Sequence, residues 1–90
     1  MSADNGIYIG HFPDGWRVTH AQAIENIDYY PEGSAERKQE LKEYFGKSKL
    51  YPSLDEAYQK ALEIESEIAN SEFPILEYGI CILGKLEAFD

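Results

Sequence analysis

The residues best suited to chemistry are concentrated near the start of the chain, between Ser2 and Asn26. Their side chains can donate or accept hydrogen bonds, stack on planar groups, or titrate near neutral pH. Aromatic rings on strands can stack on planar bases, and a nearby arginine or backbone amide can hold a phosphate. We therefore predict a ligand-binding surface in this segment, formed by Asn5, Tyr8, His11, Trp16, Arg17 and His20.

Catalytic and metal chemistry have weaker support in the same segment. His20 beside Asp4 or Glu25 could perform acid–base catalysis, but at such generic spacing a histidine bonded to backbone is the commoner outcome. The chain has no phosphate-cradling glycine-rich loop and no nucleophile elbow. A metal site needs its ligands on one face, and the hairpin register predicted below places His11 and His20 on opposite faces. We therefore expect a non-enzymatic protein without a metal or a cofactor.

A β-hairpin must position these residues. Residues 7–12 have the pattern of a strand, Pro13-Asp14-Gly15 is typical of a three-residue turn, and residues 16–21 form the return strand. We predict that Phe12 faces Trp16 across the turn. The hairpin then has two faces, one carrying Tyr8, Gly10, Phe12, Trp16, Val18 and His20, and the other carrying Ile7, Ile9, His11, Arg17, Thr19 and Ala21.

Apolar residues at helical spacing predict three helices after the hairpin. The first is a short helix over residues 21–28, for which a strand is the alternative, and the second covers residues 35–45 after a capping serine, Ser34. The third has the strongest pattern, because Ser53 begins an S-x-x-E capping box that opens residues 54–69.

Two further strands complete the prediction. Residues 49–51 form a short edge strand that ends at Pro52, and residues 78–83 are apolar on both faces, which is typical of a central strand. The expected order is β-β-α-α-β-α-β. We predict a single domain over residues 1–90 of the α+β class, a small two-layer domain with an antiparallel or mixed sheet packed on helices.

The charge distribution limits the partners. The chain has 90 residues and a net charge of −9, from 17 acids against 8 bases. Residues 53–77 hold seven of the acids, whereas five of the bases lie in residues 34–52. Since affinity for phosphate backbones requires clustered Lys and Arg, we expect no direct binding of nucleic acid. An acidic surface can instead occupy a basic groove on another protein.

The composition also indicates a compartment. Cys81 is the single cysteine, so it cannot form an intrachain disulfide, and its apolar surroundings are typical of a buried strand. The start of the chain lacks the basic and apolar segments of a signal peptide, and no apolar run reaches the roughly 20 residues of a membrane span. A reducing cytoplasm and no membrane association are expected.

The opening of the chain resembles a known family. MSADNGIYI, followed by a hairpin and then by HAQAIEN, is similar to small uncharacterised proteins of tailed bacteriophages and prophages. YFG at Tyr44 to Gly46 and EYGI at Glu77 to Ile80 match further parts of that pattern. The resemblance implies a location in the host bacterial cytoplasm and an accessory role during infection. By analogy, such accessory proteins block host factors, including immune systems.

These observations support three hypotheses of function. The leading one is a phage accessory protein that binds a host defence component and sequesters a small nucleotide-type signal. The alternative is an acidic protein inhibitor, acting as a nucleic-acid mimic or in the manner of an anti-CRISPR, of a host effector. The third is a structural or virion-associated phage protein. The sequence is compatible with a homo-oligomer.

Overall fold

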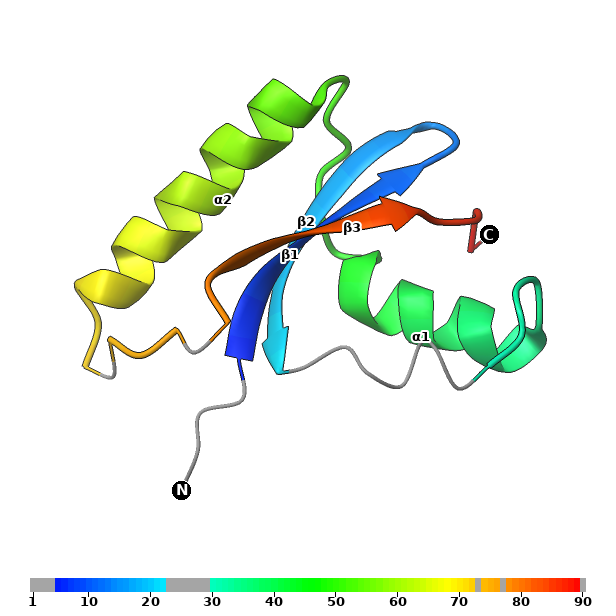
Figure 1. Cartoon of the computed structure of the whole chain (residues 1–90), viewed down its shortest axis with the longest axis horizontal. Coiled ribbons are helices and arrows are strands. Elements are labelled where there is room, and N and C mark those ends of the chain that lie inside the picture. The colour runs from blue at the N-terminus through cyan, green and yellow to red at the C-terminus, as the bar shows by residue number, and fades with distance from the viewer. Residues whose placement is uncertain (1–4, 23–29, 73, 77, 90) are drawn as a thin grey trace.

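The computed structural model describes residues 5–22, 30–72, 74–76 and 78–89. These residues form a small α+β domain in which a three-stranded sheet lies between two helices (Figure 1). The predicted class and the mixed sheet packed on helices are confirmed. In chain order the elements are β1 (Asn5–Phe12), β2 (Gly15–Gln22), α1 (Ala35–Phe45), α2 (Leu54–Ala69) and β3 (Ile80–Lys85).

The first strand lies in the middle of the sheet. The strand order is β2-β1-β3, with β1 antiparallel to β2 and parallel to β3. The prediction that the last strand is central is therefore wrong. Both faces of β3 are apolar for a different reason, because Ile80 packs toward one helix while Cys81 and Leu83 pack toward the other.

The register of the hairpin differs from the prediction by one residue. Phe12 pairs with Gly15, and His11 pairs with Trp16. Gly15 belongs to β2 rather than to the turn, since it extends the strand with a φ of +146° that other residues rarely adopt. A shift of one residue moves every side chain of β2 to the opposite face. The prediction therefore combined each face of β1 with the wrong face of β2.

Each face of the sheet is covered by one helix. Leu41 and Phe45 of α1 pack with Phe12 on one face, while Ala57 and Ala61 of α2 pack on the other. The layering is thus helix–sheet–helix where two layers were expected. The cause is the unbroken apolar run in β1, whose successive residues point to opposite faces and need cover on both. The buried apolar side chains of β1 are Ile7 and Ile9 under α2, with Tyr8 and Phe12 under α1.

Both long helices begin at the predicted caps. The Ser34 side chain accepts a hydrogen bond from the backbone N–H of Arg37, and the Ser53 side chain accepts one from that of Glu56. The predicted strand at residues 49–51 is reduced to a single bridge between Tyr51 and Trp16.

The short helix predicted over residues 21–28 is wrong at its start, because residues 21 and 22 belong to β2. The alternation of β2 continues through these two residues and takes them into the pairing with β1. The rest of that prediction lies outside the described residues. None of the described helices has both the length and the apolar character needed to cross a bilayer.

Candidate functional site

The six residues predicted to bind a ligand do not form one surface. The observed register places Asn5, His11, Trp16 and His20 on the face covered by α2. Tyr8 and Arg17 lie on the opposite face, which α1 covers. A ligand on one face could not contact all six side chains.

Tyr8 and Arg17 have structural roles. Tyr8 is only 7% exposed and belongs to the hydrophobic cluster under α1. The Arg17 guanidinium donates hydrogen bonds of 3.0 and 3.1 Å to the two carboxylate oxygens of Asp14. It also lies 4.9 Å from the ring centroid of Phe12 and 4.8 Å from that of Phe89. Arg17 therefore links the hairpin turn to the C-terminal segment, because it contacts both Asp14 and Phe89.

The other four residues form two separate pairs. The rings of His11 and Trp16 are stacked, with centroids 3.9 Å apart and planes at 2°. The amide Nδ2 of Asn5 lies 3.3 Å from Nε2 of His20 and donates a 3.0 Å hydrogen bond to the carbonyl of Ile75. The pairs are separated by about four residues of strand, roughly 13 Å at 3.4 Å per residue. His20, in the pair with Asn5, lies beside larger surface hollows than His11 does.

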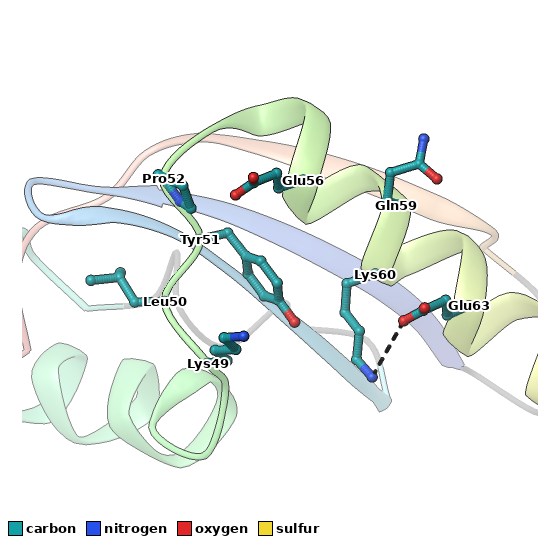
Figure 2. A pocket seen from close by; sticks show the side chains of 8 residues that line it. All are labelled: Lys49, Leu50, Tyr51, Pro52, Glu56, Gln59, Lys60 and Glu63. Carbon is teal, nitrogen blue, oxygen red and sulfur yellow. Dashed lines mark ion pairs between the residues drawn. The ribbon is translucent and has the colours of Figure 1, made fainter.

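A groove begins at the outer edge of β2, beside His20, and continues between α2 and the segment before it. It consists of two adjoining hollows with volumes of about 420 and 570 Å³. We call it the β2 groove. Figure 2 shows the larger hollow, which lies between α2 and the segment that precedes this helix, with the Tyr51 ring between the side chains of Lys49 and Lys60. Lys49, Tyr51 and Lys60 line both hollows.

Backbone bonds hold the wall of this groove against β2. Tyr51 exchanges two 2.8 Å hydrogen bonds with Trp16, each donating its N–H to the other's carbonyl. The Ser48 hydroxyl accepts a 3.0 Å hydrogen bond from the N–H of Val18 and donates one of 2.8 Å to the carbonyl of Lys49. A Cβ on Gly15 would lie 2.8 Å from the carbonyl oxygen of Tyr51, so only glycine permits this approach. These bonds hold the backbone that carries Lys47 and Lys49 beside the sheet.

The smaller hollow has a positive lining in a strongly acidic protein. Among the described residues, its titratable side chains are His20, Lys47, Lys49, Lys60 and two tyrosines, with no carboxylate. The larger hollow is mixed, because two glutamates of α2 also line it. One of these, Glu63, has an oxygen 3.8 Å from Nζ of Lys60. An anion would therefore bind most favourably at the end nearer His20.

Tyr44 adds a polar group to the smaller hollow. Burial raises the pKa of its phenol, and the charges of Glu40 and Glu43 raise that pKa further. The phenol stays protonated at neutral pH and can donate a hydrogen bond to an anion. Tyr51 supplies an aromatic ring in the same place, which suits a ligand that combines a negative charge with a planar group.

The volume of the groove is in the range of small-molecule sites, about 300–1,000 Å³. Lysine ammonium groups bind phosphate oxygens as point charges. Among the described residues, no group of three or more His, Cys, Asp or Glu side chains is placed to hold a metal ion. The β2 groove is therefore suited to an anion. Of the six residues predicted to bind a ligand, His20 is the one that lines it.

Sequence reasoning missed the three lysines and Tyr51. The excess of bases in residues 34–52 could have indicated Lys47 and Lys49. Lys60 carried no such signal, because it lies in the most acidic part of the chain and reaches the groove only through the packing of α2.

Relatives do not supply a further clue to the ligand. Comparison with protein-family models, with curated proteins and with solved structures gives no match for this chain. The geometry of the β2 groove is therefore the basis on which a function is proposed.

Proposed function

We propose that this protein is a non-enzymatic binding protein that captures a small phosphorylated, nucleotide-type anion in the β2 groove. In the fuller form of the proposal it is a phage accessory protein. It acts in the cytoplasm of the bacterial host and sequesters a nucleotide signal of an antiviral defence.

One observation carries the binding proposal. Lys47, Lys49 and Lys60 surround a hollow of about 420 Å³ whose described lining has no carboxylate, although the protein has a net charge of −9. Clustering of bases in an acidic protein produces a local positive field that an anion can find. The protein as a whole still repels long nucleic acids, which favours a small ligand.

The side chains suggest how the ligand would lie. Phosphate oxygens would contact the ammonium groups of Lys47 and Lys49 and the phenol of Tyr44. A base would stack on the ring of Tyr51, which also faces the larger hollow. Stacking on an aromatic side chain contributes about 1–3 kcal/mol per base. Both parts of a nucleotide thus have a partner.

The biological setting of the proposal depends on the resemblance of the opening block and of YFG and EYGI to phage proteins. The alternative of an acidic inhibitor draws on the exposed carboxylates of α2. Lys60 interrupts these carboxylates and lies close to one of them, Glu63. A continuous row of negative charge that imitates a phosphate backbone is therefore poorly represented on this helix, and we favour the groove.

The test is a substitution in the lining of both hollows. Lys49→Gln removes one positive charge and keeps most of the side-chain length. Against a panel of cyclic dinucleotides and ADP-ribose derivatives, measured by calorimetry and thermal shift, at least one compound should bind the natural protein. The variant should bind it about tenfold or more weakly, since hydrogen bonds to charged groups contribute about 1.5–3 kcal/mol.

Lys38→Gln is the matched control, because Lys38 is an exposed lysine of α1 outside the groove. It changes the net charge equally and should leave binding unchanged. No heat and no thermal shift with any compound would refute the proposal, because a ligand that binds tightly must raise the melting temperature. Equal weakening by both substitutions would show attraction to overall charge instead of a site.

A further inference from the structure

We infer that two copies of this chain associate through the edges of their β3 strands, around a twofold axis at Cys81. The two sheets would join into one continuous sheet. This inference does not depend on the β2 groove, which lies at the opposite edge of the sheet.

The outer edge of β3 is open in the described part of the chain, since β3 is the last strand in the order β2-β1-β3. The N–H of Ile7 donates a 2.9 Å hydrogen bond to the carbonyl of Gly79. Bonding groups in a parallel pair alternate along the strand, so Gly79 and Cys81 turn their backbone groups toward β1. Ile80 and Ile82 therefore turn their N–H and C=O groups outward. Unpaired groups of this kind are a template for another strand.

Apolar side chains accompany this edge. Ile82 is 54% exposed, although Ile9, its partner on β1, is fully buried. Helical geometry places Tyr58 and Leu62 on the flank of α2 away from Lys60, which faces the β2 groove. Tyr58 and Leu62 are both exposed.

The helices leave room for a partner. The contacts of α2 with the sheet are mainly with β1 and β2, and those of α1 are mainly with β2. In Figure 1, β3 crosses in front of β1 and β2, and neither α1 nor α2 lies across it. A second sheet can approach this edge without displacing a helix.

The open edge is complementary to itself. A twofold axis at Cys81 places Ile80 opposite the partner's Ile82, and each such pair exchanges two backbone hydrogen bonds. The strand sequence ICILGK has no acid, so no carboxylate of β3 itself opposes the pairing of the two strands. Beyond Ile82 the pairing of β3 with β1 becomes irregular, and Lys85 adds a charge. Both features limit how far a partner strand can pair toward the end of β3. Only a twofold axis at Cys81 gives hydrogen-bonding partners to the outward backbone groups of both Ile80 and Ile82 in each copy.

This register has a chemical consequence at Cys81. The two copies of Cys81 face each other as a non-hydrogen-bonded antiparallel pair, with Cα atoms about 4.5 Å apart. A disulfide requires about 4.4–6.8 Å between these atoms. Oxidised glutathione can therefore link the two thiols. They lose two protons and two electrons, one intermolecular S–S bond forms, and the oxidant is reduced to two molecules of glutathione.

The experiment measures association of the whole chain by sedimentation equilibrium, with Ile82→Lys and Ile82→Pro as edge variants and Ala35→Lys as control. The natural protein should be a dimer whose dissociation follows dilution. Both edge variants should dissociate about tenfold or more readily, because lysine charges the seam and proline removes an outward N–H without removing a bond to β1. Ala35→Lys adds the same charge on an exposed position of α1 and should leave the dimer intact.

Cross-linking of the natural protein gives a second measurement, and its expected product does not depend on the Ile82 variants. Oxidised glutathione should convert the natural protein to a covalent dimer, and Cys81→Ser should abolish this product while keeping the non-covalent dimer. A monomer at millimolar concentration would overturn the inference. A dimer that survives both Ile82 substitutions, or one that does not cross-link through Cys81, would overturn the proposed edge or its register.

Discussion

At the scale of single residues, the type of a side chain proved a poor guide to its role. Arg17 has the chemistry of a phosphate ligand, yet it is committed to Asp14 and to two phenyl rings. Its side chain is only 13% exposed. The β2 groove is instead lined by lysines that have no distinctive neighbours in the sequence. Side chains that could bind a ligand are distinguished from structural ones by the partners they already have.

The pair of Asp14 and Arg17 gives a prediction about pH. The hydrogen bonds from Arg17 lower the pKa of the Asp14 carboxyl from its ordinary value of 3.8. Because this pKa is depressed in the folded state, the contribution of the pair is present above the ordinary value and is lost as the pH falls through the lowered one. A carboxyl NMR titration should give a midpoint for Asp14 below 3.8. Arg17→Gln should raise that midpoint, and an unchanged midpoint would contradict the assignment.

Gly10 gives a prediction about packing. A Cβ at this position would lie 2.8 Å from Cε2 of Phe12 and 2.9 Å from Cδ1 of Leu86. Gly10→Ala should therefore destabilise the protein by about 1–3 kcal/mol, the range for overpacking of a core. Chemical denaturation measures this change. Gly84→Ala is the control, since a Cβ there would meet nothing within 4 Å, and equal losses from both substitutions would contradict the packing argument.

At the scale of elements, the start of α2 is specified by its serine cap. The Ser53 side chain caps the N–H of Glu56 at 3.3 Å, and α2 supplies Ala57 and Ala61 to the core. Ser53→Ala should reduce the free energy of unfolding by about 1 kcal/mol, because amide donors of the first turn lose their acceptor. Thermal or urea denaturation measures the change. Ser66→Ala, at an exposed position inside the same helix, should have no destabilising effect.

The elements predicted best from the sequence are those with local signals. Both described helices have a capping serine and an apolar stripe within one stretch of chain, and both have the predicted bounds. The strand pairings depend on distant residues and were predicted less well. Whether Gly15 belongs to the turn or to β2 depends on Tyr51, whose carbonyl requires the close approach that only glycine allows. That one residue decided the register of the hairpin, and with it the face on which each candidate side chain lies.

At the scale of the whole molecule, the candidate site depends on parts that are far apart in the sequence. The β2 groove needs the edge of β2, the segment from Lys47 to Tyr51 and one lysine of α2. The composition indicated an acidic protein and the apolar patterns an α+β fold, but neither could show that helices cover both faces of the sheet. That arrangement leaves the two edges of the sheet for a partner: the β2 edge, where the segment around Tyr51 is bonded to the strand and lines the groove, and the β3 edge, where backbone groups point outward. We propose a small anion for the β2 edge and a second copy for the β3 edge.

The pairing of β1 with β3 also constrains how the protein is made. β1 emerges from the ribosome early, yet one of its two neighbours, β3, is translated after both helices. Contacts between such distant segments close slowly, because a long stretch of chain must be ordered first. The sheet can therefore be completed only after synthesis has passed Lys85. Until then Ile7 and Ile9 lack part of their native cover, and the nascent chain is vulnerable to aggregation and to chaperone capture.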